Sequence, residues 1–149
     1  LEELKRQLKK PRKWNKRHSR MSENFNLEII SPDQTLLNSE ANQVVIPAYE
    51  GIMTILKDHI SLITFLRPGF IEVKINNKVS KFYVEDGTVE FFNNKLLILS
   101  SSVIQIDKLA KNNIEKMIEQ SKVLLENSEI KDKEKYILNY KINSLQEIN

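Results

Sequence analysis

The stretch FIEVKINNKVSKFYVEDGTVEFFNNKLLILSS, residues 70–101, decides the fold class of this chain. In its first run Ile71, Val73 and Ile75 fall on one face of a strand. The last run, KLLILSS, is continuously apolar, which is typical of a strand buried on both faces. Short turn signals separate the β-prone runs, at Asn76-Asn77, Asp86-Gly87 and Asn93-Asn94. The stretch therefore predicts a series of β-hairpins.

The same pattern extends upstream. FNLEII, residues 25–30, alternates between apolar and polar side chains. TLL (35–37) and VVI (44–46) are further β-prone pieces, and Pro47 is expected to end the second because proline donates no ladder hydrogen bond. Strand candidates that recur about every eight to twelve residues favour an antiparallel sandwich or barrel over alternating βαβ units.

The apolar period changes to that of a helix after Asp107. Asp107 is expected to cap a first helix and Asp132 a second, with a stop at Asn127-Ser128 between them. The apolar stripe of the first helix comprises Leu109, Ile114, Met117, Ile118, Ser121, Leu124 and Leu125. That of the second comprises Leu138, Ile142 and Leu145. The two stripes predict an antiparallel helical hairpin.

Tyr136 and Tyr140 lie four residues apart on the opposite side of the second helix. Two interpretations remain open. Either this second face packs on the sandwich or on another chain, or the tyrosines are exposed and covered by lysine stems. An isolated hairpin of short helices is only marginally stable, so the hairpin is expected to be the most mobile part of the protein.

The sequence thus predicts an α+β chain, with an N-terminal antiparallel β-sandwich at residues 21–106 and a C-terminal two-helix antiparallel hairpin at 107–149. Residues 1–20 differ sharply in composition. They hold nine Lys/Arg and two Glu, a balance of +7, whereas the rest holds fourteen Lys/Arg and eighteen Asp/Glu, a balance of −4. The mildly acidic body argues against a nucleic-acid-binding surface on it.

The basic arm, residues 1–20, has two interpretations. It is either a functional membrane-surface or nucleic-acid-binding arm, or a leader that precedes the true start at Met21. We favour the leader because the composition changes abruptly at Met21. The mass of the native protein distinguishes the two.

The sequence offers little for catalysis. It has no cysteine and two histidines, so a disulfide, a thiol nucleophile and a histidine-rich metal site are not expected. Phosphate-binding loops, paired-glycine fingerprints and nucleophile elbows are missing, as is any run of about 18 apolar residues. His59 follows Asp58, but neighbours on a strand point to opposite faces, so we expect a structural or docking His59 and no metal or catalytic site.

The order of motifs resembles the epsilon subunit of F-type ATP synthases, called delta in mitochondria. The likeness rests on Glu50-Gly51 before IMTIL, the segment Asp58 to Leu62, Arg67-Pro68-Gly69 before a strand, and VEDGTVEFFNNKLLILSSSV before two terminal helices. It covers Phe25 to the C-terminus. Asp58-His59-Ile60-Ser61 stands where the family has a Gly-His-Ala-Pro-like turn.

The resemblance implies a non-catalytic rotor subunit on the central stalk. Such a subunit binds the gamma subunit, stands on the ring of c subunits and helps to couple proton flow to ATP synthesis. Its hairpin folds against the sandwich or extends toward the alpha and beta subunits, where it restrains ATP hydrolysis. The implied location is peripheral, on the cytoplasmic face of a bacterial inner membrane or, as an alternative, on an organelle inner or thylakoid membrane, with no contact to nucleic acid.

The resemblance also implies site residues. Tyr49, Glu50, Gly51 and Ile52 match the loop that meets the c-ring. His59 and Leu62 match the region that faces gamma.

Some bacterial members bind ATP through an Ile-Asp-x-x-Arg-Ala motif at the start of the hairpin. Here Ile106 and Asp107 match, but Ala110 stands at the arginine position and Lys111 at the alanine position. Without that guanidinium the phosphates lose a fork of donors, so we expect weak or absent ATP binding and no other cofactor. Ile106 and Asp107 are then either a vestigial nucleotide site or, for Asp107, a helix cap.

Two other functions compete with the rotor subunit. The first is a free-standing β-sandwich binding module whose helices form a dimerisation hairpin, which a stable homodimer in solution would favour. The second is a nucleic-acid adaptor that depends on residues 1–20. An enzyme has almost no support in the sequence.

Overall fold

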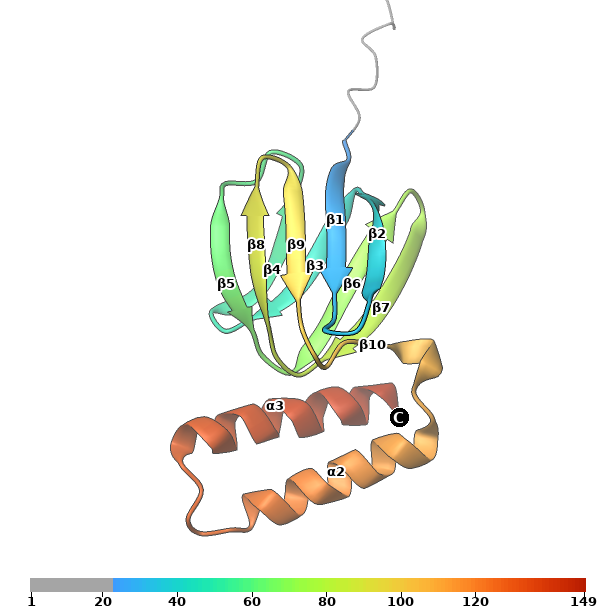
Figure 1. Ribbon diagram of the computed structural model, residues 1–149. Helices are drawn as coiled ribbons and strands as arrows, with labels where there is room; N and C mark the ends of the chain where they lie inside the picture. Colours follow the sequence, from blue (N-terminus) through green and yellow to red (C-terminus); the bar gives the residue numbers. More distant parts are fainter. Residues whose placement is uncertain (1–22) are drawn as a thin grey trace, which may run out of the picture.

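The computed structural model describes residues 23–149, which form a β-sandwich followed by two antiparallel helices (Figure 1). The strands are β1 (Phe25–Ile30), β2 (Thr35–Ala41), β3 (Gln43–Ala48), β4 (Gly51–Leu56), β5 (Leu62–Leu66), β6 (Gly69–Ile75), β7 (Lys78–Val84), β8 (Gly87–Phe92), β9 (Lys95–Leu99) and β10 (Ile104–Gln105). A 3₁₀ turn, η1 (Ile106–Lys108), leads to α2 (Lys111–Leu125) and α3 (Asp132–Ile148). The α+β fold predicted from the sequence is confirmed. The basic arm, residues 1–20, lies outside the described residues.

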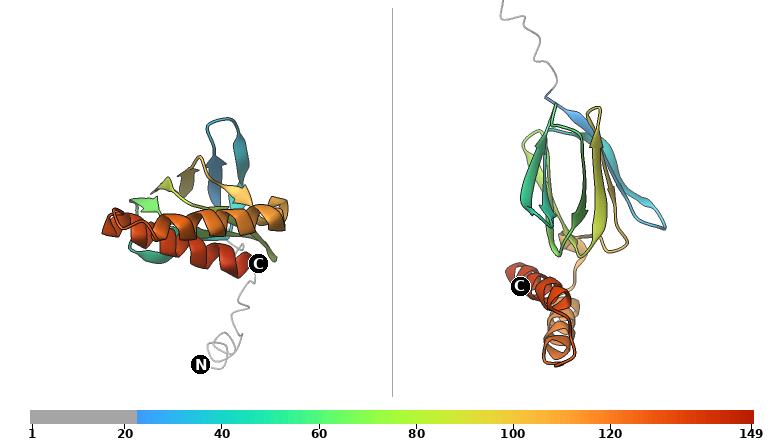
Figure 2. Two further views of the ribbon diagram at one scale, coloured as in Figure 1. Left: turned by 90° about the horizontal axis from the view of Figure 1, so that it is seen from below. Right: turned by 90° about the vertical axis from the view of Figure 1, so that its left-hand side faces the viewer.

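The strands form one curled sheet that folds over into two facing layers (Figure 2). One layer runs β4-β3-β6-β7-β10 and the other β5-β8-β9-β1-β2. The layers join through β3 and β5, where Ala48 pairs with Leu66. All neighbouring strands pair antiparallel except β1 and β9, which run parallel. The prediction of an antiparallel sandwich therefore holds for every pair but one.

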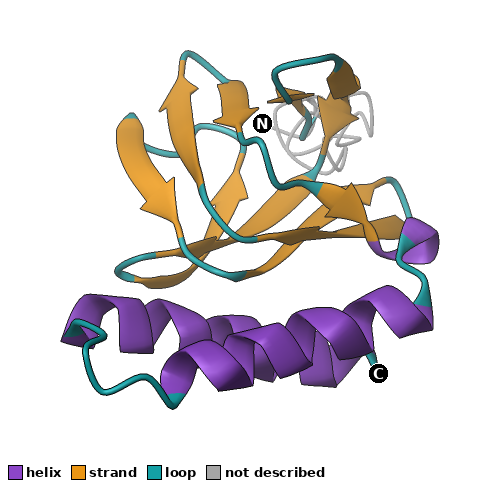
Figure 3. Ribbon diagram, turned by 60° about the horizontal axis from the view of Figure 1, so that its bottom comes forward, coloured by secondary structure: helices purple, strands orange, loops and turns teal. Residues whose placement is uncertain are grey.

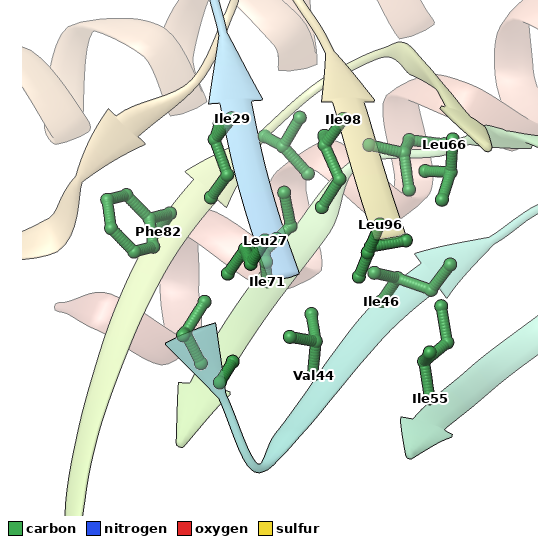
Figure 4. Packing of buried hydrophobic residues seen from close by; sticks show 14 of the residues in the cluster. Leu27, Ile29, Val44, Ile46, Ile55, Leu66, Ile71, Phe82, Leu96 and Ile98 are labelled. Carbon is green, nitrogen blue, oxygen red and sulfur yellow. The ribbon is translucent and has the colours of Figure 1, made fainter. Parts of the chain in front are cut away.

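The main core fills the space between the two layers with inward-facing aliphatic and aromatic side chains (Figure 4). On β1, for example, Phe25, Leu27 and Ile29 are buried, as the alternation of FNLEII predicts. Burying one such side chain contributes about 1.5–3 kcal/mol to folding. None of the buried residues of this core comes from the hairpin.

The predicted turns are confirmed. Asn76 and both Asn93 and Asn94 adopt positive φ, which asparagine tolerates better than most residues, and each pair joins two antiparallel strands. The prediction for Pro47 is wrong. Pro47 lies inside β3 opposite Ile52 of the edge strand β4, because its missing N–H removes only one bond of the ladder.

The prediction that KLLILSS is buried on both faces is also wrong. Leu96 and Ile98 of β9 are fully buried, whereas Leu97 is only half-buried and Leu99 is 44% exposed on the outer face. Within this chain nothing described covers that outer face.

A second, smaller core joins the hairpin to one end of the sandwich (Figure 3). Tyr83 at the end of β7 packs with Ile114 and Ile118 of α2 and Leu145 of α3. Both helices therefore bury part of their predicted apolar stripes, and α3 lies next to the strands (Figure 1). The prediction is wrong for Leu124 of the first stripe, which is 53% exposed.

The two cap predictions are wrong. Asp107 lies in η1, and α2 starts at Lys111 after Ala110, with no side-chain cap. The chain cannot begin the helix at Asp107 because Ile106 and Leu109 first turn inward against the second core. Asp132 is the first residue of α3 rather than its cap, where its carboxylate still faces the positive end of the helix.

Candidate functional site

The predicted loop Tyr49–Ile52 forms the tight turn between β3 and β4. Ala48 pairs with Gly51, so Tyr49 and Glu50 alone reverse the chain. Gly51 has φ of +139°, a conformation that other residues rarely adopt, which explains the glycine at this position. Ile52, the next residue, is 76% exposed.

Hydrogen bonds fix the shape of this turn. The Tyr49 N–H donates to the Phe65 carbonyl oxygen at 3.1 Å, and Thr64 Oγ1 donates to Glu50 Oε2 at 2.8 Å. The bond from Thr64 lowers the pKa of Glu50, with a smaller contribution from a backbone hydrogen bond. The turn therefore presents an ionised carboxylate beside an exposed isoleucine.

His59 lies at the other end of the sandwich, in the turn between β4 and β5 (Figure 1). Its ring packs edge-on to buried Phe91, with centroids 5.8 Å apart, and Nδ1 lies 2.8 Å from the Ile60 carbonyl oxygen. Its neighbour Asp58, with φ of 62°, exchanges two hydrogen bonds with Asn94 of the β8–β9 turn. These contacts give His59 a structural place rather than an approach to a nucleophile.

Leu62 points toward the core and is half-buried there. The residues that face outward beside it are Ile60 and Ile63, which are 78% and 72% exposed. The structure therefore does not bring the two predicted groups together. Tyr49–Ile52 lies at the hairpin end of the sandwich, and His59 and Leu62 lie at the opposite end.

A surface that the sequence analysis missed lies on the outer side of β5, β8 and β9. Four of its large apolar side chains are exposed and Leu97 is half-buried, and we call the five the outer apolar face: Ile63, Phe65, Phe92, Leu97 and Leu99. Strand register places Phe65 and Leu99 on either side of Thr88, and Ile63 and Leu97 on either side of Glu90. Thr88 and Glu90 of β8 therefore lie between these apolar side chains. Large apolar side chains exposed together on one sheet face are typical of an interaction surface. The continuous run KLLILSS was the signal for it.

A groove of about 700 Å³ links the outer apolar face to the Tyr49 turn. Phe65 and Leu99 line it from the face, Tyr49 from the turn, and Lys133 from the start of α3. The turn and the face thus belong to one continuous surface.

The predicted vestigial nucleotide residues lie in and after η1. Ile106 packs against the second core, whereas Asp107 is exposed. Ala110 and Lys111, at the start of α2, are exposed as well. This arrangement offers no arginine at the helix start.

Residues 23–149 hold neither a cluster of metal ligands nor a helix that could span a membrane. No three His, Asp or Glu side chains gather there as a metal site would require. Neither α2 nor α3 has the length and apolar character needed to cross a bilayer.

The chain matches a family model over most of its sandwich. The model, described as ATP synthase, Delta/Epsilon chain, beta-sandwich domain, matches residues 24–106.

Curated relatives carry the same description. The ATP synthase epsilon chain of Pelagibacter ubique (strain HTCC1062) is 44% identical over 130 residues, which cover 87% of this chain and 100% of that relative. The ATP synthase epsilon chain of Allorhizobium ampelinum is 34% identical over 110 residues, which cover 73% of this chain and 82% of the relative.

Solved structures share the fold at low identity. A chain of the Euglena gracilis mitochondrial ATP synthase, OSCP/F1/c-ring, superposes with a TM-score of 0.70 at 16% identity, covering 83% of this chain and 80% of that one. A chain of the Tetrahymena thermophila mitochondrial ATP synthase central stalk and c-ring gives a TM-score of 0.59 at 14% identity, covering 82% and 93%.

Proposed function

This chain belongs to the ATP synthase delta/epsilon family, and from that membership we propose that it is a non-catalytic rotor subunit of the central stalk of a proton-translocating F-type ATP synthase. Its sandwich binds the gamma subunit and rests on the c-ring, and its hairpin restrains ATP hydrolysis. A subunit in this position couples the rotation of the ring to the rotation of gamma.

The outer apolar face carries this proposal. Ile63, Phe65 and Phe92 are 72%, 59% and 58% exposed, although aromatic and branched side chains of this size are usually buried. Leaving several of them in water on a rigid sheet lowers solubility, so a permanent protein partner is the simplest account. We assign the gamma subunit to this face.

The Tyr49 turn supports the contact with the c-ring. A two-residue turn stiffened by the Thr64 bond presents the Glu50 carboxylate and the Ile52 side chain at the hairpin end of the sandwich. A carboxylate in this setting pairs with basic residues on a partner loop, and Gly51 allows the backbone to approach closely.

The hairpin supports the inhibitory role. It contacts the sandwich through a small core, and Val123 and Leu124 near the end of α2 remain 62% and 53% exposed. A weakly held helix pair with unused apolar side chains suits an element that docks in two places. In its extended state we assign those side chains to contacts with the alpha and beta subunits.

The location follows from the complex. We place the chain at the cytoplasmic face of a bacterial inner membrane, held there through gamma and the c-ring. The chain itself supplies no catalytic group and uses no cofactor in this role.

Binding to gamma tests the assignment. The full chain is expected to form a one-to-one complex with the gamma subunit of its own organism, and Phe65→Glu together with Leu99→Glu is expected to weaken that complex at least tenfold. Val79→Glu, at an exposed apolar residue on β7 outside the face, serves as the matched control and is expected to bind normally. A chain that ignores gamma and forms a stable homodimer through its helices would contradict the assignment.

Removing the hairpin tests its inhibitory role, the restraint of ATP hydrolysis by the extended hairpin, which we call the brake. A chain that ends at residue 106 keeps every buried residue of the main core, so its sandwich is expected to fold. The assembled enzyme with this shortened chain is expected to hydrolyse ATP faster than the enzyme with the full chain. An unchanged rate of ATP hydrolysis would contradict the inhibitory role of the hairpin.

A further inference from the structure

Arg67, in the turn between β5 and β6, joins the sandwich to helix α3 through two kinds of contact. Its Nη1 donates a hydrogen bond to the Tyr136 hydroxyl oxygen at 3.0 Å. Its guanidinium carbon lies 4.0 Å from the centre of the Tyr140 ring. The two tyrosine rings also pack edge to face, with centroids 4.7 Å apart. We call these three residues the Arg67 clamp.

The backbone holds Arg67 in place for these contacts. Its N–H donates to the Pro47 carbonyl oxygen at 2.9 Å. Gly69 lets the turn lie close against β3, because a Cβ at that position would come within 2.7 Å of the Pro47 Cβ. The guanidinium is therefore presented to α3 from a fixed point on the sandwich.

The chemistry of the clamp gives it direction but limits its strength. A planar guanidinium both stacks on a ring and donates a directed bond, which a lysine ammonium cannot do together. Tyr136 is 39% exposed, and Arg67 Nε is buried without a hydrogen-bond partner among residues 23–149. Both features limit the net stabilisation, since exposed contacts are shared with water and an unpaired buried donor is costly.

We infer that the Arg67 clamp sets how often helix α3 leaves the sandwich, and that it thereby regulates the brake. The clamp spans the two parts that must separate, and neither tyrosine belongs to the buried residues of the two hydrophobic cores. Loosening it releases the hairpin without unfolding either part. This inference rests on the function proposed above.

A thiol reporter measures the release. The chain has no cysteine, and Ser144 is 8% exposed on α3, with Oγ 3.5 Å from the Pro68 carbonyl oxygen across the joint. Ser144→Cys therefore introduces one thiol that reacts with a soluble disulfide reagent only when α3 moves away. Ala41→Cys, at a residue 1% exposed in the main core, reports unfolding of the sandwich instead.

Arg67→Ala is expected to speed labelling in the Ser144→Cys background about tenfold, because it removes one stacked cation and one charge-assisted hydrogen bond. Arg67→Lys is expected to give an intermediate rate. Labelling in the Ala41→Cys background is expected to stay unchanged. Lys95→Ala, which removes a cation paired with Glu28 on the sandwich, is the matched control and is expected to alter neither rate.

Two results with Arg67→Ala would overturn the inference. One is an unchanged rate in the Ser144→Cys background. The other is an equal rise in both backgrounds, which would show that Arg67 stabilises the sandwich instead. Tyr140→Leu provides a second route, since it should speed labelling in the native background and add little once Arg67→Ala is present; fully additive effects would also overturn the clamp.

The same variants separate the clamp from the brake. Arg67→Ala is expected to lower ATP hydrolysis by the assembled enzyme, because a freed hairpin spends more time extended. Faster labelling with unchanged hydrolysis would support the contact of Arg67 with α3 but contradict the inhibitory role of the hairpin. Unchanged labelling would contradict the role of the Arg67 clamp, whatever the rate of ATP hydrolysis.

Discussion

Lys141 Nζ lies 3.0 Å from Glu85 Oε1, and this ion pair ties helix α3 to the turn after β7. Both side chains are sheltered, at 22% and 29% exposure. Glu85 Oε1 also accepts a hydrogen bond from the Tyr83 hydroxyl at 3.3 Å. Burial, and then the charge of Glu85, raise the pKa of Tyr83, so the phenol stays protonated and remains the donor.

Substitutions at Glu85 separate the two interactions. Glu85→Gln keeps an acceptor for Tyr83 but loses the ion pair, and is expected to lower the free energy of unfolding by about 0.5–1 kcal/mol. Glu85→Ala also leaves the Tyr83 hydroxyl without that acceptor, which is expected to bring the loss to about 2–3 kcal/mol. Urea titrations measure both. Equal losses would show that the Tyr83 bond contributes nothing. Glu28→Gln, in the ion pair with Lys95 on the sandwich, is the control.

The Tyr49 turn is expected to depend on pH through Glu50. Its pKa is lower in the folded chain, so the stabilisation is present above the ordinary pKa of a glutamate and is lost as the pH falls through the lowered value. Thr64→Val is expected to raise the pKa of Glu50 toward its ordinary value. A carbon-detected NMR titration of the carboxyl group measures this shift. Thr54→Val, on the exposed side of β4, is the control, and an equal shift in both variants would contradict the role of Thr64.

The exposed end of α2 provides a test of the brake that leaves the docked hairpin intact. Val123→Glu with Leu124→Glu changes side chains that are 62% and 53% exposed, so the free energy of unfolding is expected to change by less than about 1 kcal/mol. ATP hydrolysis by the assembled enzyme is expected to rise, because the extended hairpin loses its apolar contacts. Lys122→Glu, also exposed on α2, is the charge control. Unchanged hydrolysis would show that these residues do not serve inhibition.

Nucleotide binding at the start of the hairpin is expected to be weak or absent. Ala110 replaces the arginine that would supply paired donors, and Ile106 is turned toward the second core. Isothermal titration calorimetry with ATP is expected to detect no micromolar affinity. Ala110→Arg tests the reason given, since it restores the guanidinium and is expected to strengthen binding. A micromolar dissociation constant in the native chain would contradict the prediction.

Local chemistry made part of the fold predictable. The asparagine pairs Asn76-Asn77 and Asn93-Asn94 specify tight turns through their tolerance of positive φ, and the alternation of FNLEII specifies which side of β1 is buried. The apolar stripes at helical spacing likewise identified most of the buried faces of α2 and α3, with Leu124 as the exception.

The errors arose where distant contacts decide the outcome. Asp107 has the chemistry of a helix cap, but the packing of Ile106 and Leu109 delays the helix to Lys111. KLLILSS is apolar on both sides, and periodicity cannot tell whether the second side is covered by this chain or by a partner. The contact of Arg67 with Tyr136 spans 69 positions in the sequence, so no local pattern indicated it.

Cross-linking of the intact enzyme tests the central claim most directly. ATP synthase purified from the membranes of the source organism is expected to contain this chain. An amine-reactive cross-linker is expected to join Lys95, beside Phe92 at the edge of the outer apolar face, to the gamma subunit. Lys78, the first residue of β7, is expected to give no such link. An enzyme that lacks this chain, or links to gamma from Lys78 alone, would contradict its place on the rotor.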